Sequence, residues 1–199
     1  MKKGFVLAVV FMVSMVTKTF AQDETAYYQG SSSVTVGYGI GNIWKTLFKL
    51  SGSFFGGDYK VSATGPVALT YEYGASENIS VGVQLGYSKI TGKYTDPNPV
   101  DSYTESLTNF SALARANYHF GQSDKFDPYV GLGLGYYNFK YDYKDGSGNT
   151  NNSSFSVPSA FGFSGQLGAK YYIASNFGLY LEVGYVGGSI VQGGLALRF

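Results

Sequence analysis

The 199-residue chain contains no cysteine, which excludes a disulfide framework, a thiolate metal site and a lipid-modified N-terminal cysteine. Charged residues make up only 14% of it, well below the roughly 25–35% that suits a soluble surface. Beyond the first residues, no apolar run approaches the about 20 residues that a membrane-spanning helix requires. A membrane protein built from this chain therefore cannot be helical.

The start of the chain has the order of a secretory signal peptide. Lys2 and Lys3 precede an apolar run, and a small-x-small tripeptide ends at Ala21. We expect a signal peptide over residues 1–21 and a single mature domain over residues 22–199. Three of the 14 basic residues lie in the signal and all 13 acidic residues lie beyond it, so the mature chain carries a formal charge of −2. That charge argues against a nucleic-acid partner.

Glycine and aromatic residues are abundant, with 28 Gly, 19 Tyr and 15 Phe. Bulky residues alternate with small or polar ones along many segments, and this period of two predicts β-strands. The last stretch alternates in the same way and ends on Phe199. We expect eight strands, at about residues 32–41, 66–74, 79–88, 107–120, 128–136, 159–174, 177–185 and 189–199.

The connections between these strands differ in length. Short turns are expected near residues 75, 121 and 175, and longer loops near 42, 92 and 144. Short turns on one side and long loops on the other are typical of outer-membrane barrels, whose even strand number places both termini in the periplasm. After Tyr136 the bulky residues change phase, which predicts either a bulge or a strand that leaves the membrane.

Volume decides which face of the strands points into the barrel. An interior enclosed by eight strands is just wide enough to be filled by side chains, and about 35 bulky groups would not fit. The bulky face must point outward into lipid, where a closed sheet pairs every backbone group. The sequence therefore predicts an all-β fold, an eight-stranded antiparallel transmembrane up-and-down β-barrel, rather than a soluble barrel of the lipocalin kind.

Residues 42–57 depart from the alternation. Their apolar residues recur at helical spacing, which predicts a short amphipathic helix within a loop. The aromatic residues of this segment are candidates for contact with the outer leaflet, the barrel or a partner. They are Trp44, Phe48, Phe54 and Phe55.

The predicted signal, the eight strands and the C-terminal sequence Leu195-Ala-Leu-Arg-Phe199 resemble the small outer-membrane β-barrel family. That family includes the OmpX and OmpA transmembrane barrels, and the resemblance is greatest to the opacity-like proteins of Bacteroidetes. It implies a protein of the Gram-negative outer membrane, surrounded by outer-membrane lipid. It also implies that the barrel-assembly machinery recognises Phe199.

Five charged residues fall on the inward phase of the predicted strands: Glu72, Arg115, Lys170, Glu182 and Arg198. Charges enclosed with little water must pair or lose several kcal/mol of solvation. We expect these residues to form a barrel-interior charge cluster whose ion pairs plug the lumen. The alternative is that the same charges line a gated or narrow pore.

The single histidine, His119, is the base that any Ser-His-acid triad would need. It stands at the end of the fourth predicted strand, on the periplasmic side, where we expect a solvated or interfacial side chain. The segment from Asp145 to Asn151 is rich in oxygen ligands but lacks the glycine and the glutamate of a calcium loop. We predict no cofactor, no metal site and no enzymatic activity.

Three functions stay open at this point. The first is a non-enzymatic, monomeric surface barrel with a plugged polar interior, whose loops 42–65 and 144–157 serve adhesion, interaction with an extracellular partner or envelope integrity. The second is a narrow, porin-like channel for small solutes. The third is a surface-lipid-modifying enzyme, which the position of His119 disfavours.

Overall fold

This computed structural model describes residues 25–53, 58–97, 101–121, 123–147, 150–151, 160–186 and 188–199, and the predicted signal peptide lies outside them. The elements are β1 (Ser32–Ile40), α2 (Ile43–Ser53), β2 (Asp58–Gly74), β3 (Ile79–Thr95), β4 (Tyr103–His119), β5 (Phe126–Asp145), β6 (Thr150–Asn151), β7 (Ala160–Ala174), β8 (Phe177–Val186) and β9 (Ser189–Arg198). Within the described residues, no helix is long and apolar enough to cross a membrane.

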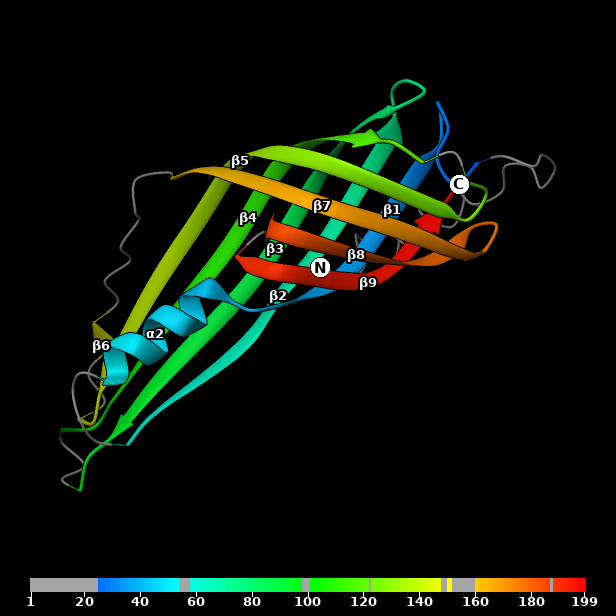
Figure 1. Ribbon diagram of the computed structural model, residues 1–199. Helices are drawn as coiled ribbons and strands as arrows, with labels where there is room; N and C mark the ends of the chain where they lie inside the picture. Colours follow the sequence, from blue (N-terminus) through cyan, green and yellow to red (C-terminus); the bar gives the residue numbers. More distant parts are fainter. Residues whose placement is uncertain are drawn as a thin grey trace, which may run out of the picture.

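Eight of these strands close into an antiparallel barrel (Figure 1). Their hydrogen-bonded order is β4-β3-β2-β1-β9-β8-β7-β5, and β4 pairs with β5 to complete the ring. The seam between the first and last strands runs from Ser33 opposite Arg198 to Ile40 opposite Val191. The two-residue β6 pairs with the far end of β5. The predicted up-and-down barrel of eight strands is confirmed.

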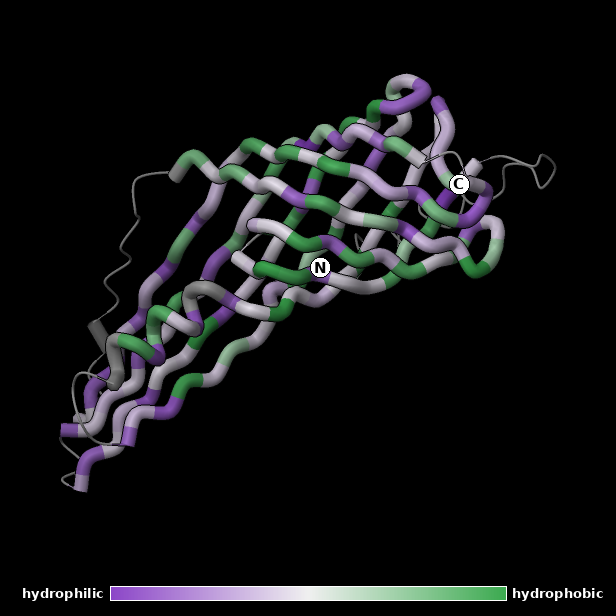
Figure 2. The backbone as a smooth tube through the Cα atoms, in the orientation of Figure 1, coloured by the Kyte–Doolittle hydropathy of each residue, from purple (hydrophilic) through white to green (hydrophobic). Residues whose placement is uncertain are grey.

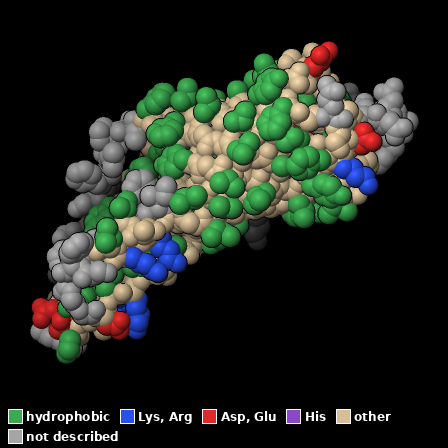
Figure 3. Space-filling model, viewed as in Figure 1, with side chains coloured by type: hydrophobic (Ala, Val, Ile, Leu, Met, Phe, Trp, Pro, Cys, Tyr) green, Lys and Arg blue, Asp and Glu red, His purple; other side chains and the backbone are tan. Residues whose placement is uncertain are grey.

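The two faces of the barrel wall differ as the alternation predicts. The outward side chains of Val36 and Leu132 are 50% and 71% exposed, whereas the inward Ser33 and Thr35 are buried. Hydropathy alternates along the strands in Figure 2, and Figure 3 shows hydrophobic side chains spread over the barrel with charged ones gathered at its ends. The bulky face therefore points outward.

Several large rings also lie inside the barrel, set against glycine. The ring of Tyr129 covers Gly168, where an added Cβ would come within 2.6 Å of the ring. The ring of Tyr180 covers Gly37 in the same way, and both tyrosines are buried. The glycine-rich inward face thus makes room for a few aromatic rings as well as for polar groups.

Four neighbouring strands are longer than the rest. β2, β3 and β4 have 17 residues each and β5 has 20, whereas β1, β8 and β9 have 9 or 10. The extra lengths project beyond the shorter strands as a four-stranded sheet (Figure 1, lower left). We call this sheet, residues 58–65, 89–95, 103–108 and 139–145, together with α2 the extension. The opposite end, with the turns after β2, β4 and β7, is the base.

The extension corrects two predicted loops. Both ends of the predicted loop near residues 92–105 are strand, because β3 continues to Thr95 and β4 begins at Tyr103. In the same way β2 begins at Asp58, inside the predicted loop 42–65. Outward positions here carry lysines and aspartates that meet water. Backbone pairing therefore continues after the hydrophobic alternation has ended.

The change of phase after Tyr136 is not a bulge. β4 and β5 pair over their whole shared length without a register shift. Tyr137 points inward and is 5% exposed, so the bulky residues that follow Tyr136 lie on the inner face of β5. The strand leaves the apolar band here, which was one of the two predicted alternatives.

The predicted amphipathic helix is confirmed as α2, which packs against β2 and β3. Asn42 caps its N-terminus, because the Asn42 Oδ1 accepts the backbone N–H three residues later at 3.2 Å. Trp44 lies within the helix and Phe48 is half-buried. Phe54 and Phe55 fall outside the described residues.

Candidate functional site

Arg115 of β4 and Glu182 of β8 form an ion pair across the lumen of the base. Arg115 Nη2 lies 2.6 Å from Glu182 Oε1, and Nη1 lies 3.4 Å from Oε2. The Tyr129 hydroxyl donates a hydrogen bond to the same Oε1 at 2.8 Å. All three side chains are buried. A two-pronged guanidinium–carboxylate contact in an enclosed site is among the stronger polar interactions in proteins.

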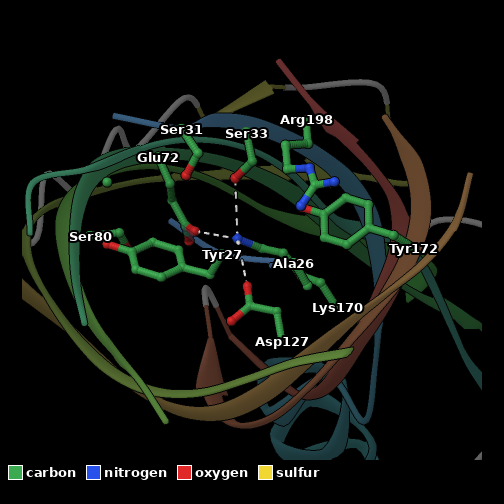
Figure 4. A pocket seen from close by; sticks show the side chains of 11 residues that line it. Ala26, Tyr27, Ser31, Ser33, Glu72, Ser80, Asp127, Lys170, Tyr172 and Arg198 are labelled. Atoms are coloured by element: carbon green, nitrogen blue, oxygen red, sulfur yellow. Dashed lines mark hydrogen bonds and ion pairs between the residues drawn. The ribbon is translucent and has the colours of Figure 1, made fainter. Parts of the chain in front are cut away.

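Lys170 of β7 and Glu72 of β2 form a second pair (Figure 4). Lys170 Nζ lies 2.5 Å from Glu72 Oε2 and 3.9 Å from Asp127 Oδ2. The other Glu72 oxygen lies 3.8 Å from Arg115 Nη2, which joins the two pairs. We call these side chains, together with Glu182, the charge network.

Glycines beside these charges allow the long side chains to cross the lumen. Arg115 stands opposite Gly82 on one neighbouring strand and Gly133 on the other. Glu182 stands opposite Gly168. A charge buried alone costs several kcal/mol, and this cost explains why each is found with a partner of opposite sign. Four of the five predicted inward charges thus meet in one network.

Arg198, the fifth predicted charge, lies apart from the network at the mouth of the base. Its guanidinium donates to the backbone carbonyls of Ser175 and Thr25, each at 2.7 Å. It also lies over the ring of Tyr172, 4.6 Å from the centroid. Arg198 therefore ties the end of β9 to the neighbouring backbone rather than neutralising a carboxylate.

The expectation that His119 is solvated or interfacial is wrong, because the side chain is fully buried. Its Nδ1 lies 2.6 Å from Asp127 Oδ1, and its Nε2 lies 2.9 Å from Ser80 Oγ. The ring of Tyr27 stacks on the imidazole with centroids 3.7 Å apart. Tyr27 comes from a segment outside the predicted strands, so its cover over the strand end was missed. We expected Asp127 in a turn. It lies two residues before Tyr129, whose side chain points inward, so the alternation of faces would have placed Asp127 in the lumen as well.

Residues 25–31 form a strap across the mouth of the base. The Ala26 N–H donates to the Ser123 carbonyl at 2.7 Å. The Tyr27 hydroxyl donates to the Ser76 carbonyl at 2.9 Å. Ala26 and Tyr27 are buried, and the cavity beneath them has a volume of about 10 Å³. Figure 4 shows Tyr27 beside Ser80 within this enclosed mouth.

A second polar cluster lies on the inner face of the extension, in a region predicted to be largely loop. Glu105 of β4 accepts hydrogen bonds from the hydroxyls of Tyr59, at 2.5 Å, and Tyr141, at 2.6 Å. The ring of Tyr103 stacks between two more tyrosines on the adjacent strands, Tyr94 at 5.1 Å and Tyr143 at 5.7 Å. We call these five rings and Glu105 the tyrosine cluster.

The tyrosine cluster differs electrostatically from the base. Burial, followed by the hydrogen bond that each hydroxyl donates to Glu105, raises the pKa of Tyr59 and of Tyr141 well above the usual range. Burial and the charge of Glu105 also raise the pKa of Tyr103. In the described part of the chain, Glu105 takes part in no ion pair. Its negative charge is therefore held by hydroxyl groups alone.

Comparison with known proteins shows which family the barrel belongs to. The model of a family described as outer membrane protein beta-barrel domain matches residues 5–196. The chain belongs to this outer-membrane barrel family. Outer membrane protein W of Salmonella typhimurium is 28% identical over 190 residues, which cover 94% of this chain and 84% of the relative. Outer membrane protein W of Escherichia coli K12 is 28% identical over 191 residues, with the same coverage.

Solved outer-membrane barrels are similar to this one at a lower level. The crystal structure of OprG from Pseudomonas aeruginosa has a TM-score of 0.46 and 12% identity, and the match covers 90% of this chain and 99% of OprG. The solid-state NMR structure of AlkL in DMPC bilayers has a TM-score of 0.45 and 17% identity, with 92% and 97% covered. Both scores lie below 0.5, so the family assignment depends on the sequence match.

As a member of the outer-membrane barrel family, the protein lies in the bacterial outer membrane, with its outward apolar side chains in contact with lipid. Phe199, the predicted assembly signal, lies at the seam. Its N–H donates to the Ser32 carbonyl at 2.9 Å, and its carbonyl accepts the Ser32 N–H at 2.8 Å. The last residue is therefore held against the first strand of the closed sheet.

Proposed function

We propose that this outer-membrane barrel is a non-enzymatic, monomeric surface protein with a closed interior, whose extension contacts molecules outside the cell. The charge network under the strap is the observation that carries this proposal. The cavity of about 10 Å³ beneath the strap is close to the least room that a single water molecule needs. A solute could pass the base only if the strap and the ion pairs both moved.

Conductance tests whether the interior is closed. The full mature barrel in a planar lipid bilayer should show almost no current, and Glu182→Ala and Arg115→Ala should stay closed because the strap still covers the mouth. Steady conductance of the unaltered protein would contradict a closed interior. A current that appears only in the two variants would instead make the ion pairs a gate.

The orientation of the barrel can be tested with single cysteines, because the chain has none of its own. The proposal places the extension outside the cell and the turns of the base in the periplasm. A membrane-impermeant maleimide should label Asp58→Cys on intact cells but not Glu77→Cys, which lies in the turn between β2 and β3. The reverse pattern would overturn the orientation, and lysed cells serve as the control in which both are labelled.

The absence of catalysis is proposed in spite of the arrangement of Ser80, His119 and Asp127. The hydrogen-bond order is that of a Ser-His-Asp triad. Ser80 is nonetheless 1% exposed, and Tyr27 covers the imidazole, so no substrate carbonyl reaches the hydroxyl. These bonds are better explained as satisfying buried polar groups. Mass spectrometry of surface lipid from a deletion strain should show no change, and a specific change would support an enzyme.

A narrow channel is the second candidate, and unpaired polar atoms favour it. Within the described residues, Gln84 Nε2 and Oε1, Thr70 Oγ1, Ser88 Oγ and Asn109 Oδ1 are buried without a hydrogen-bond partner in the protein. Buried polar groups of this kind usually bind water. Liposomes that contain the barrel should swell in small polar solutes if these groups line a path. No swelling would favour the closed barrel.

Assembly gives Phe199 its proposed role. The resemblance to small outer-membrane barrels supports recognition of this residue by the barrel-assembly machinery. Deleting Phe199 should lower the amount of folded protein in the outer membrane, whereas Leu195→Ala, on the outward face of the same strand, should leave it nearly unchanged. Normal insertion of the deletion variant would remove this role while leaving the barrel itself intact.

A further inference from the structure

Among the described residues, Glu105 has no basic partner, whereas the enclosed acids of the base are paired with bases. In the base, Glu72 meets Lys170 and Glu182 meets Arg115. Glu105 is partly buried, yet it accepts only tyrosine hydroxyls. A carboxylate held in partial enclosure without a counter-charge produces a negative potential that favours a cation.

The five tyrosines around Glu105 suit one class of cation. They come from all four strands of the projecting sheet, and each ring is partly buried and partly open to solvent. The rings of Tyr94, Tyr103 and Tyr143 are stacked in a row across three strands, with interplanar angles of 22° and 27° between neighbours. Aromatic faces attract cations through the ring quadrupole, most effectively weakly hydrated organic ones.

We propose that the tyrosine cluster is a binding site for a small organic cation with an ammonium head group, which lies against the aromatic rings beside Glu105. The site goes beyond the proposed function and does not depend on the orientation of the barrel or on the state of its lumen. It requires only that the sheet of the extension holds the six side chains together.

A divalent metal fits the cluster less well. Both oxygens of Glu105 already accept hydroxyl hydrogens, and calcium takes six to eight oxygen ligands, several of them charged. A neutral apolar ligand would gain nothing from the carboxylate. An organic cation uses both features, because its alkyl groups contact the rings while its charge remains near Glu105 without needing a direct bond to oxygen.

Calorimetry with the refolded full-length barrel tests the site with choline as the probe. The neutral isostere 3,3-dimethylbutan-1-ol has the same shape without the charge, so it measures the apolar contribution alone. We expect choline to bind at least about tenfold more tightly than the isostere. Absent binding of choline, or equal binding of the two compounds, would overturn the proposal.

Three variants assign the binding to the cluster. Glu105→Gln should weaken choline binding about tenfold, while Asp58→Asn, which removes an exposed charge from the same end of the sheet, should change it less than about twofold. Tyr103→Leu should abolish binding and Tyr103→Phe should retain it, because only the ring is needed. Equal losses in Glu105→Gln and Asp58→Asn would show diffuse attraction instead of a site. The gel mobility of the folded barrel confirms that each variant is folded.

Discussion

The base and the extension use the same inward positions of the same strands in different ways. In the base, acids from β2 and β8 meet bases from β4 and β7, and the side chains are sealed under the strap. In the extension, Glu105 of β4 meets only tyrosines, and the rings stay partly open. The inward charges of the base are thus paired with opposite charges, whereas the inward carboxylate of Glu105 has no ion-pair partner among the described residues.

Removing one partner of the charge network should have the largest effect. Glu182→Ala leaves Arg115 buried without its main partner, which should lower the free energy of unfolding by about 3–5 kcal/mol. Urea unfolding from lipid vesicles, followed by circular dichroism, measures the change. Lys60→Ala is the matched control in the extension. It breaks the exposed pair with Asp58 and should cost less than about 0.5 kcal/mol.

Equal losses in these two variants would contradict the difference between the base and the extension. The reverse substitution sharpens the test. The double variant Arg115→Met with Glu182→Leu removes both charges and should recover much of the stability lost by Glu182→Ala, because no charge then stays unpaired. Failure to recover would mean that the shape of the pair, and not its charge, holds the base together.

A substitution in the aromatic packing of the base should have the next effect. Gly168→Val places a branched side chain where Tyr129 lies, since even a Cβ would come within 2.6 Å of the ring. We expect a loss of about 1–3 kcal/mol in the same unfolding experiment. At Gly165 on the same strand an added Cβ would meet only Leu132, at 3.6 Å, so Gly165→Val should be tolerated. A tolerated Gly168→Val would show that the base is not tightly packed.

Loosening the strap should have a smaller effect. Tyr27→Ala removes the ring stacked on His119 and the hydrogen bond to the Ser76 carbonyl, at a cost of about 1–2 kcal/mol. The same change should raise the rate at which a maleimide labels Ser80→Cys in the folded barrel. Tyr27→Phe keeps the ring and should label slowly. Equal labelling with Phe and Ala at this position would mean that the ring does not cover the mouth.

The barrel could be predicted from the sequence because its outward face meets lipid. That contact requires a bulky residue at every second position, as in β3, and the period of two then fixes which side chains point inward. Glu72, Arg115, Lys170 and Glu182 were found in this way. Their pairing depends on strand register and tilt across the lumen, which alternation alone does not specify.

The parts that were missed lie where the lipid constraint ends. The outward positions of the extension face water, so Tyr59 and Glu105 were placed in loops although their strands continue. The strap has no periodic pattern at all, and the burial of His119 depends on it. Asp127 could have been found from its phase, since it lies two residues before the inward Tyr129. The turn composition around it concealed that signal.

The smallest expected effect concerns pH, and it separates the two regions most directly. Burial and Glu105 raise the pKa of Tyr59 and Tyr141 in the folded protein, above the value of about 10 in an unfolded chain. Their hydrogen bonds therefore stabilise the extension fully below about pH 10, and this contribution is lost as the pH rises through the raised pKa. Ultraviolet titration of the folded barrel should show these tyrosines ionising late. Tyr59→Phe should remove one late group and cost less than about 1 kcal/mol, because the site is partly exposed. An unchanged titration in Glu105→Gln would show that the carboxylate does not set the electrostatic potential of the tyrosine cluster. The proposed electrostatic difference between the extension and the base would then be wrong.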